Sequence, residues 1–393
     1  MSVDPDRVIL AYADGLDSPR SRPDVVLAAA GLGEKTGDLL LGWTPEHREW
    51  LSEPIHRGRT IIAGYGLADA VNEGRIAYLP VRLSAMPALL ADLLRPEVAV
   101  VAGVRRGSTL VFGMSAGWGL AAARAARRVV VEIDPEGLDL GGPEIPGNIC
   151  ATIERPRHSD PYPVLRSPGV VDRRIAEHVI SVLPPHPILQ LGPGGVAEAI
   201  MAAIREPVGI WSGLVTDSLL DLEARGLLVG PATAAYVWGG QAYSALARAG
   251  RLRLRPVEET HDLSRLSGFD GYVGCNTALQ VGFDGSVNVE RAGRRLVAGI
   301  GGHADFCAAA SRSVGGLSII ALASVTKAGV STIVPTVETT STARSDVGVV
   351  VTEHGVADLR GLDDAERTSR LIGIAAPEHR YGLRDAASER ASR

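Results

Sequence analysis

The sequence lacks the features that would mark several classes of protein, beginning with cysteine. Among 393 residues, Cys150, Cys275 and Cys307 are too few and too scattered for a disulfide framework or a zinc site. We therefore expect three buried thiols in a reducing cytoplasm.

Excess basic charge and long apolar runs are also absent. The formal net charge is −5, whereas a nucleic-acid-binding face needs clustered Lys and Arg to release phosphate counterions. No N-terminal stretch has the charged start, apolar core and small-residue cleavage site of a secretory signal. No apolar run approaches the roughly 20 residues that a membrane helix needs. These absences predict a cytoplasmic protein with neither a nucleic acid nor a membrane as partner.

Short apolar, β-branched runs alternate with Ala- and Leu-rich helical segments along the whole chain. Continuous apolarity is typical of strands that are buried on both faces, and helices between them favour βαβ units with a mostly parallel sheet. The expected strands are residues 60–66, 98–104, 129–133, 187–192, 208–211, 296–302, 318–324, 331–337 and 347–353.

A polar, proline-rich stretch at residues 155–174 is the best candidate for a linker. It divides the chain into residues 1–168 and 169–393, in agreement with a length that favours two domains. We expect two open, mostly parallel α/β domains. The arginine-rich end, 380–393, is expected to be a solvated helix or a frayed terminus.

Two glycine-rich segments could carry chemistry. "LQLGPGGVAEAI" (189–200) reads as a strand, a glycine turn and a helix whose first N–H groups could hold an anion, although a tight turn alone also explains it. "AGIGGHADF" (298–306) places His303 beside two glycines, whose N–H groups could polarise a carbonyl while the histidine supplies a base. A glycine bulge with a surface histidine is the other interpretation.

Two further segments end apolar runs with polar residues. Asn276 could bind an amide or cap a turn, and Glu353 could orient a ligand or pair with Arg360. Because open α/β sheets bind ligands at the carboxyl ends of their strands, these segments could gather at one edge.

Read in order, the segments resemble the acetyl-CoA hydrolase/transferase family, which includes 4-hydroxybutyrate and succinyl-CoA:acetate CoA-transferases. The resemblance is strongest over 181–383, where "LQLGPGGVAEAI", "CNTALQVGFDGSVN", "GIGGHADF" and "VTEHGVADLRG" follow the family's order; it is weaker in the N-terminal half. It implies two similar domains of the NagB/RpiA-like CoA-transferase type with a CoA thioester in the cleft between them. Acyl-CoA would be the substrate, and no metal would be needed.

The resemblance also implies which residues contact the substrate. In the family, a glutamate carboxylate attacks the acyl-CoA and forms a glutamyl-CoA thioester. The residues expected to hold CoA are Gly192, Pro193, Gly194, Gly195, Val196, Leu279, Gly301 and Gly302. Those expected around the acyl group and the acceptor are Trp211, Ser212, Asn276, Gln280, Asp305, Phe306 and Glu353.

The chain departs from the family's pattern at positions that surround this pocket. The replacements are Gly213 for the nucleophilic glutamate, Pro193 within the glycine loop, Gln280 and Gly282 for two acidic residues, and His303 for a serine or glutamine. A pocket with several such changes is expected to have been rebuilt.

These departures leave three hypotheses. In the first, the protein transfers the acyl group of acyl-CoA to an amine, a hydroxyl or water without a glutamyl intermediate. His303 would act as base, Gly213 would leave room for the acceptor, and Asp217 would complete the catalytic set. A thiol nucleophile, Cys275 or Cys307, is a minor variant of it.

In the second hypothesis, the protein is a conventional acyl-CoA:carboxylate CoA-transferase that uses another carboxylate. Glu198 and Asp217 are the nearest ones, although a helix surface and a helix N-terminus explain them more simply. In the third, it is a non-catalytic CoA-binding or partner subunit. The expected partners are small molecules, acyl-CoA and an acceptor, with a homodimer as one possible assembly.

Overall fold

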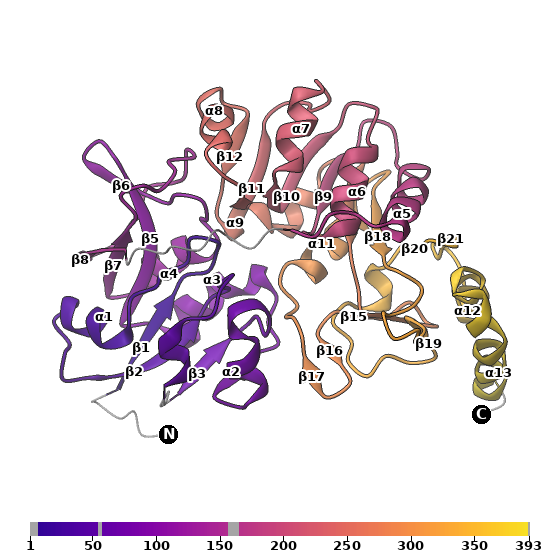
Figure 1. The fold of residues 1–393 in the computed structure, drawn as a ribbon, viewed down its shortest axis with the longest axis horizontal. Coiled ribbons are helices and arrows are strands. Elements are labelled where there is room, and N and C mark those ends of the chain that lie inside the picture. Colours follow the sequence, from indigo (N-terminus) through magenta and orange to yellow (C-terminus); the bar gives the residue numbers. More distant parts are fainter. Residues whose placement is uncertain (1–6, 54–56, 156–164, 392–393) are drawn as a thin grey trace. The chain divides into compact units, whose positions relative to one another are not determined.

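Two large, mostly parallel sheets form the framework of the computed structural model, which describes residues 7–53, 57–155 and 165–391 (Figure 1). The chain divides into two compact units. The first comprises Met1–Val164, Pro231–His261 and Leu296–Gly301, and the second comprises Leu165–Gly230, Asp262–Arg295 and Gly302–Arg393. A single break after residue 168 does not reproduce this grouping, because two later segments belong with the N-terminal part.

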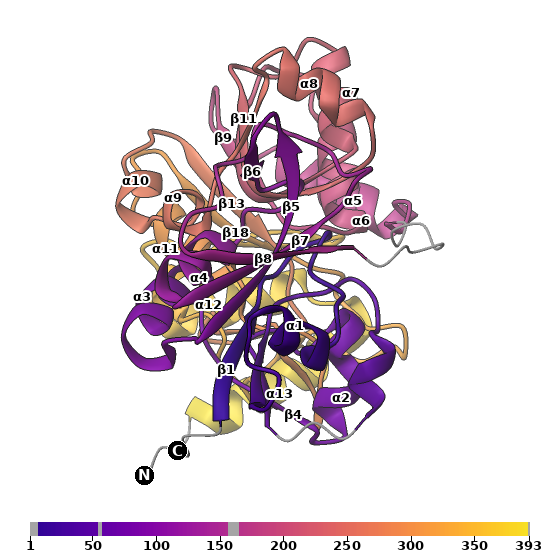
Figure 2. The ribbon, with the colours of Figure 1, turned by 90° about the vertical axis from the view of Figure 1, so that its left-hand side faces the viewer.

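The sheet of the first unit has the strand order β4-β3-β2-β1-β5-β7-β8, with β6 beside β5. Strands β5, β7 and β8 are labelled in Figure 2. All neighbours pair in parallel except β5 and β6. The strands are β1 (Arg7–Tyr12), β2 (Thr36–Leu41), β3 (Gly58–Thr60), β4 (Ile76–Tyr78), β5 (Val98–Arg106), β6 (Thr109–Val111), β7 (Arg128–Ile133) and β8 (Ile149–Glu154).

The central strand of this sheet shows why the apolar runs are continuous. Every residue from Val98 to Val104 in β5 is buried, so both faces of the strand are covered. The helices of this unit are α1 (Pro23–Ala29), α2 (Ala68–Asn72), α3 (Met86–Ala88) and α4 (Gly119–Ala125), with short helices at Glu49–Ser52, Tyr65–Leu67, Leu83–Ala85 and Leu89–Leu94. The later segment adds β11 (Ala232–Trp238), α8 (Ala242–Arg248), β12 (Leu252–Leu254) and α9 (Val257–Thr260).

In the second unit, the strands follow the order β10-β9-β13-β18-β20-β21. All pairs are parallel except β20 and β21. These strands are β9 (Ile188–Leu191), β10 (Gly209–Thr216), β13 (Tyr272–Asn276), β18 (Leu317–Ala321), β20 (Val349–Thr352) and β21 (Gly355–Asp358). The parallel arrangement in both units confirms the predicted fold class.

The remaining elements of the second unit surround this sheet. Its helices are α5 (Val170–Ile180), α6 (Gly195–Ala203), α7 (Ser218–Ala224), α10 (Leu263–Ser267), α11 (His303–Ala310), α12 (Asp364–Ile374) and α13 (Arg380–Ala391), with short helices at Arg344–Asp346 and Pro377–His379. A small sheet contains β14 (Gln280–Gly282), β15 (Val287–Asn288) and β19 (Ile333–Val334), and β16 (Arg291–Ala292) and β17 (Arg295–Leu296) flank a turn at Gly293. The arginine-rich end is the helix α13, as expected.

Two predicted strands are wrong over most of their length. After the end of β3, residues 61–66 form a bend and the start of a short helix. Residues 297–302 form an irregular segment after β17. In the latter, a Cβ on Gly299 would lie 2.2 Å from the Ile61 carbonyl oxygen, and Gly301 has φ +55°. The glycines therefore serve close backbone approach and a turn, not a sheet. The predicted strand at 331–337 is likewise reduced to β19.

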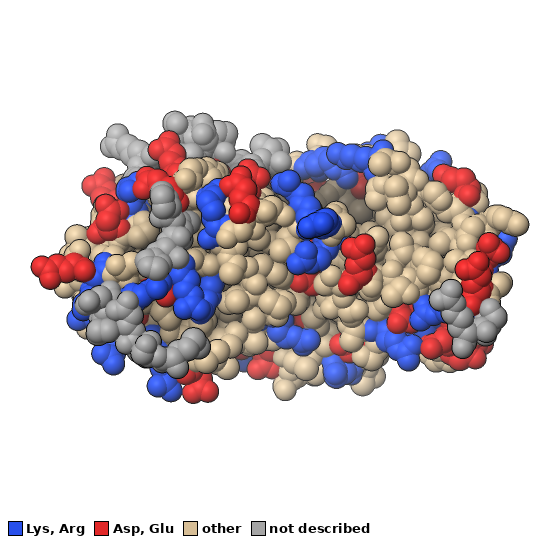
Figure 3. Space-filling model, turned by 90° about the horizontal axis from the view of Figure 1, so that it is seen from below, with Lys and Arg blue, Asp and Glu red and all other residues tan. Residues whose placement is uncertain are grey.

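The expectation of three buried thiols is wrong for Cys150, which is exposed at the start of β8, whereas Cys275 and Cys307 are buried. On the face seen in Figure 3, basic and acidic side chains are interspersed. Over the described ranges, no helix is both long and apolar enough to cross a membrane.

Candidate functional site

A pair of buried amides joins the carboxyl ends of two central strands in the second unit. Gln190, near the end of β9, donates to Asn276 Oδ1 at 3.2 Å, and Asn276, the last residue of β13, donates to Gln190 Oε1 at 3.1 Å. Asn276 therefore neither caps a turn nor offers its whole amide to a ligand. Its Nδ2 also lies 3.8 Å from Cys307 Sγ.

His303 is the first residue of α11 and continues this network. Its Nδ1 lies 2.8 Å from Thr342 Oγ1 and 3.7 Å from Cys307 Sγ. Its Nε2 is buried and has no hydrogen-bond partner among the residues that the structure describes. A buried polar nitrogen without a partner costs free energy, so this atom is the natural place for a ligand to form a hydrogen bond.

Burial sets the charge states of this cluster. Burial lowers the pKa of His303 to about 4, and the nearby backbone of Thr277 offsets part of that effect. The ring is therefore neutral at neutral pH, but it is a weak proton acceptor because general bases work best when their pKa lies near the working pH. Burial also raises the pKa of Cys275 and of Cys307 to about 12, so neither thiol is poised to become a nucleophilic thiolate.

The glycine loop lies at the end of β9, next to the amide pair. Gly194 has φ +131° and precedes α6, and a Cβ added at Gly192 or Gly194 would meet no atom within 4 Å. The backbone of Pro193 and its neighbours is thus open to a ligand at the helix N-terminus. Gly195 differs, because a Cβ there would lie 2.6 Å from Arg166 Nη2. Val196 is half-buried.

The strand expected at 208–211 is longer in the structure, because β10 continues through Ser212 and Gly213 to Thr216. The Ser212 hydroxyl donates to the carbonyl of Leu191 at 3.0 Å, which ties β10 to the end of β9. Ile210 lies opposite Leu189, so the register continued by three residues brings Gly213 level with Gly192. Gly213 is buried within the strand and contributes only its backbone.

Trp211 projects to an aromatic cluster. Its ring lies 5.0 Å from that of Phe269 and 5.7 Å from the Arg265 guanidinium carbon, and its carbonyl accepts from the Tyr272 hydroxyl at 3.4 Å. These contacts account for a tryptophan at this position through packing.

The two carboxylates nearest to Gly213 differ in their surroundings. Asp217 is an exposed N-cap residue of α7, and partial burial raises the pKa of its carboxyl. Glu198 is a half-buried residue of α6, not a free surface residue, and accepts a 2.6 Å hydrogen bond from Thr216 Oγ1. Thr216 also lies 2.8 Å from Ser218 Oγ, and the N-cap residue of α7 is Asp217, not Thr216.

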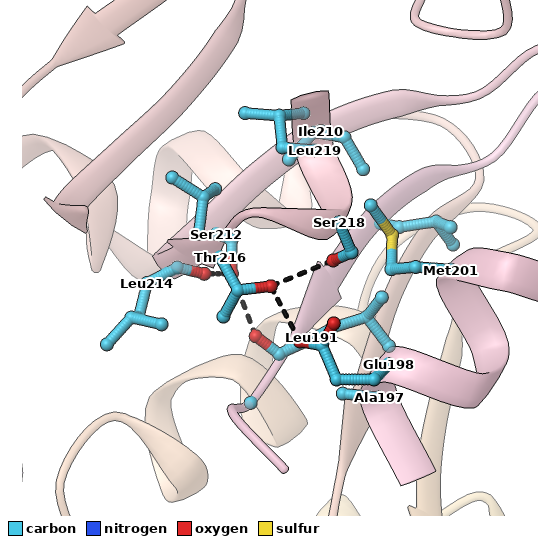
Figure 4. Close-up of a pocket in the computed structure, with 13 residues that line it drawn as sticks. Leu191, Ala197, Glu198, Met201, Ile210, Ser212, Leu214, Thr216, Ser218 and Leu219 are labelled. Carbon is cyan, nitrogen blue, oxygen red and sulfur yellow. Dashed lines mark hydrogen bonds between the residues drawn. The ribbon is translucent and has the colours of Figure 1, made fainter. Parts of the chain in front are cut away.

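Glu198, Thr216 and Ser218 lie along an otherwise mostly apolar pocket between α6, α7 and strands β9 and β10 (Figure 4). Leu191, Ala197, Met201, Ile210 and Leu219, which are labelled in Figure 4, form much of its wall. Gly192 also lines the pocket. The pocket therefore begins where the glycine loop leaves the sheet.

The other expected contact residues are divided among several places. The Gln280 side chain accepts from Asn288 Nδ2 at 3.1 Å, and the N–H of Leu279 donates to the Asn288 carbonyl at 2.9 Å. Gly302 is the N-cap residue of α11 in the second unit. Gly301 is grouped with the first unit, where its carbonyl accepts from the N–H of Leu83 at 2.9 Å.

Asp305 and Phe306 are buried in α11, where Phe306 packs in a core with Leu266 and Tyr272. Glu353 follows β20 and accepts from the N–H and hydroxyl of Ser324, at 2.9 Å and 2.7 Å. Pairing of Glu353 with Arg360 is wrong, because Arg360 pairs with Asp358 at 2.6 Å.

The structure brings Asn276 and His303 together and places the glycine loop beside Gly213. Sequence reasoning missed Gln190 and Thr342, which complete the cluster. The "LQ" at 189–190 was part of a recognised segment and could have drawn attention to Gln190, whereas Thr342 lies in a polar stretch with no distinguishing pattern. Among the described residues, no group of three or more His, Cys, Asp or Glu side chains is placed to hold a metal ion.

Comparisons with known proteins agree on one family. Residues 240–387 match the acetyl-CoA hydrolase/transferase C-terminal domain. The chain is 30% identical to a butyryl-CoA:acetate CoA-transferase of Anaerostipes caccae, over 80% of this chain and 76% of the relative. It is 29% identical to a succinyl-CoA:cyclohexane-1-carboxylate CoA transferase of Geobacter metallireducens, over 81% of this chain and 77% of the relative. A crystal structure of 4-hydroxybutyrate CoA-transferase from Porphyromonas gingivalis shares the fold, with a TM-score of 0.76 and 22% identity. The match covers 98% of this chain and 94% of that one.

Proposed function

Because this chain belongs to the acetyl-CoA hydrolase/transferase family, we propose that it transfers the acyl group of acyl-CoA to an amine, a hydroxyl or water without forming a glutamyl-CoA intermediate. Relatives named as CoA-transferases and acetyl-CoA hydrolases support acyl-CoA as the substrate. The observation that carries the finer proposal is the absence of a side chain at Gly213, together with the unpartnered Nε2 of His303.

Acyl transfer without a carboxylate nucleophile needs a group that acts on the thioester carbonyl and room for the acceptor. In this proposal His303 is the group that acts on the thioester carbonyl. Thr342 contacts it directly, and the amide pair contacts it through Cys307, so it is held beside the end of β13. Gly213, which has no side chain, leaves room for the acceptor, and Asp217 lies at the end of the same strand. The backbone around Gly192, Pro193 and Gly194 would hold part of CoA.

A screen of acyl-CoA substrates tests this function. CoA release would be measured by free-thiol detection with water, amines, alcohols and carboxylic acids as acceptors. We expect release with at least one non-carboxylate acceptor and a large loss of activity in His303→Ala. Full activity of that variant would contradict the role of His303.

Conventional transfer of CoA to a carboxylic acid is the second candidate, and the names of the relatives favour it. It requires a carboxylate nucleophile, for which Glu198 and Asp217 are the nearest candidates. Borohydride or hydroxylamine trapping after incubation with acyl-CoA distinguishes the two. A trapped glutamyl or aspartyl thioester would support transfer to acids, and failure to trap one alongside turnover would support the first proposal.

Gly213→Glu is a direct test of the same position. If the missing carboxylate determines the reaction, this variant should gain transfer to carboxylic acids and a trappable thioester. Gly213→Gln is the matched control, because it has nearly the same size but no nucleophilic carboxylate. Binding of CoA with no turnover of any acyl-CoA would instead favour a non-catalytic subunit.

We also propose a cytoplasmic location and a homodimeric assembly. Light scattering after size-exclusion chromatography tests the assembly, and a single species with the 41.2 kDa mass of one chain would contradict it.

A further inference from the structure

We infer that His303 carries its proton on Nε2 and leaves Nδ1 unprotonated, so that it donates a hydrogen bond to the thioester oxygen of acyl-CoA and does not accept a proton from the acceptor. This inference rests on the proposed function for its chemistry, while the tautomer is a property of the protein alone. It changes the role of His303 from a base to a neutral electrophile.

Thr342 is a buried partner of His303 Nδ1. This residue is 1% exposed, and its backbone exchanges two hydrogen bonds with Val287, at 3.1 Å and 3.2 Å, which fix its position. Within the described ranges, its hydroxyl has His303 Nδ1 as its only hydrogen-bond partner. In the Nδ1–H tautomer the hydroxyl proton would be buried with no acceptor in the described ranges, whereas an Nε2–H proton can be accepted by an oxygen of the bound substrate, so the hydroxyl donates and Nδ1 accepts.

Cys307 is a second neighbour of His303 Nδ1. Its thiol stays protonated because burial raises its pKa to about 12. Asn276 Nδ2 approaches the sulfur as a donor at 3.8 Å, so the S–H proton is directed away from that side. His303 Nδ1, at 3.7 Å from the sulfur, is one acceptor within reach, and the side chain of Ser318 is another hydrogen-bond partner of the thiol. The Thr342 hydroxyl donates to Nδ1 whichever acceptor the thiol uses, and a neutral imidazole whose Nδ1 accepts carries its single proton on Nε2.

The other ring nitrogen of His303, Nε2, is the one that a ligand can contact. Nε2 is buried without a protein partner in the described structure, and the ring stays neutral at neutral pH because burial lowers its pKa. A fixed N–H in a site of low polarity stabilises negative charge that develops on an oxygen, and it needs no rearrangement as the reaction proceeds. The structure thus provides a preformed donor.

In this reaction His303 neither gains nor loses a proton. The acceptor X–H attacks the carbonyl carbon, and the carbonyl oxygen takes negative charge while it accepts the Nε2–H hydrogen bond. The carbon–sulfur bond breaks, the carbonyl re-forms, and the CoA sulfur takes the proton that the acceptor loses. The products are the acylated acceptor and CoA thiol.

Two substitutions of His303 distinguish a role as hydrogen-bond donor from a role as general base. His303→Gln keeps an N–H donor near the place of Nε2 but cannot act as a base, whereas His303→Ala has neither. We expect kcat to fall by roughly 10²–10³-fold in His303→Ala, as for loss of an oxyanion donor, and by less than about tenfold in His303→Gln. Equal, large losses in both variants, with CoA binding unchanged by calorimetry, would overturn the donor role.

Nitrogen-15 NMR of histidine-labelled protein tests the tautomer without any turnover. The His303 signals are identified by their loss in His303→Gln, and the shift of each nitrogen reports whether it carries a proton. We expect a protonated Nε2 and an unprotonated Nδ1 at pH 7; the opposite tautomer would overturn the inference even if acyl transfer is found. The expected tautomer together with full activity of His303→Ala would instead refute the proposed function.

Thr342 is a positioning residue in this account. Thr342→Val removes the hydroxyl with little change in volume, and Thr342→Ser retains it. We expect Thr342→Val to increase the fraction of the Nδ1–H tautomer and to lower kcat more than it changes KM, whereas Thr342→Ser should behave like the parent. Equal behaviour of the two variants in the NMR experiment would overturn the role of Thr342.

Discussion

Gln190 and Asn276 exchange two hydrogen bonds between neighbouring strands, at 3.2 Å and 3.1 Å. Gln190 is 2% exposed and Asn276 is 6% exposed. The pair lets a polar cluster lie inside an apolar sheet, because each amide satisfies the other. It also fixes Asn276, which approaches Cys307 and through it His303.

Asn276→Leu should lower the free energy of unfolding by about 1–3 kcal/mol, because the buried Gln190 amide loses its partner. Urea unfolding measures the change. The double variant Gln190→Leu/Asn276→Leu is the control, and its cost should be smaller than the sum of the two single variants, since no amide is left unpaired. Strict additivity would show that the two amides are not coupled.

Asp14 should make the protein less stable as the pH rises towards neutrality. Its carboxyl, just after β1, accepts hydrogen bonds from the Tyr236 hydroxyl and from the N–H of Trp118, the latter at 3.1 Å. Burial raises its pKa from 3.8 to about 7. The folded state therefore binds more protons than the unfolded state between these values, and stability falls by up to about 1.4 kcal/mol per pH unit across this range.

Asp14→Asn mimics the protonated carboxyl and removes this titration. Urea unfolding at pH 5 and pH 7 should show a smaller loss of stability in the variant than in the parent. Parallel changes in the two proteins would contradict the raised pKa.

His303 should have the opposite effect at acidic pH. Its pKa is lowered from 6.5 to about 4 by burial, so the unfolded state binds more protons than the folded state between these values. Stability is then lost as the pH falls from about 6.5 to about 4. His303→Gln should lose less stability than the parent between pH 6.5 and pH 4.5. An NMR titration that finds the His303 pKa near 6.5 would contradict this prediction.

Thr216 should stabilise the wall of the pocket beside α6. Its hydroxyl donates to the half-buried Glu198 carboxylate, and Thr216 itself is 8% exposed. Thr216→Val should lower the free energy of unfolding by about 1 kcal/mol, because the carboxylate loses a donor. Thr216→Ser, which keeps the hydroxyl, is the matched control, and the prediction requires Thr216→Val to be the less stable of the two.

The sequence predicted the parts of the site that follow from local pattern. Apolar runs that end in Gly192 and Asn276 indicated parallel strands whose carboxyl ends meet, and β9 and β13 are indeed neighbours. The partner of His303 could not be predicted in this way, because Thr342 lies 39 residues further along the chain and is brought in by its pairing with Val287.

The errors have a common physical origin. The strand expected at 208–211 ended before Ser212 because small residues often end strands, but β10, which the Ser212 hydroxyl ties to the end of β9, continues through Gly213 to Thr216. Residues 297–302 looked like a strand because they are apolar, yet the close approach of Gly299 to Ile61 uses them as an irregular segment. In both places, contacts with distant residues outweighed local preference.

The regular strand around Gly213 has a consequence for how the protein could change. Gly213 is not among the glycines with positive φ, so its backbone conformation is one that residues with a side chain also adopt. Glycine codons GGA and GGG each differ from a glutamate codon by one base. A glutamate can therefore be introduced at this position by a single base change in such a codon, with no loop to rebuild, and a selection for growth on a carboxylic acid acceptor would test whether such a variant arises.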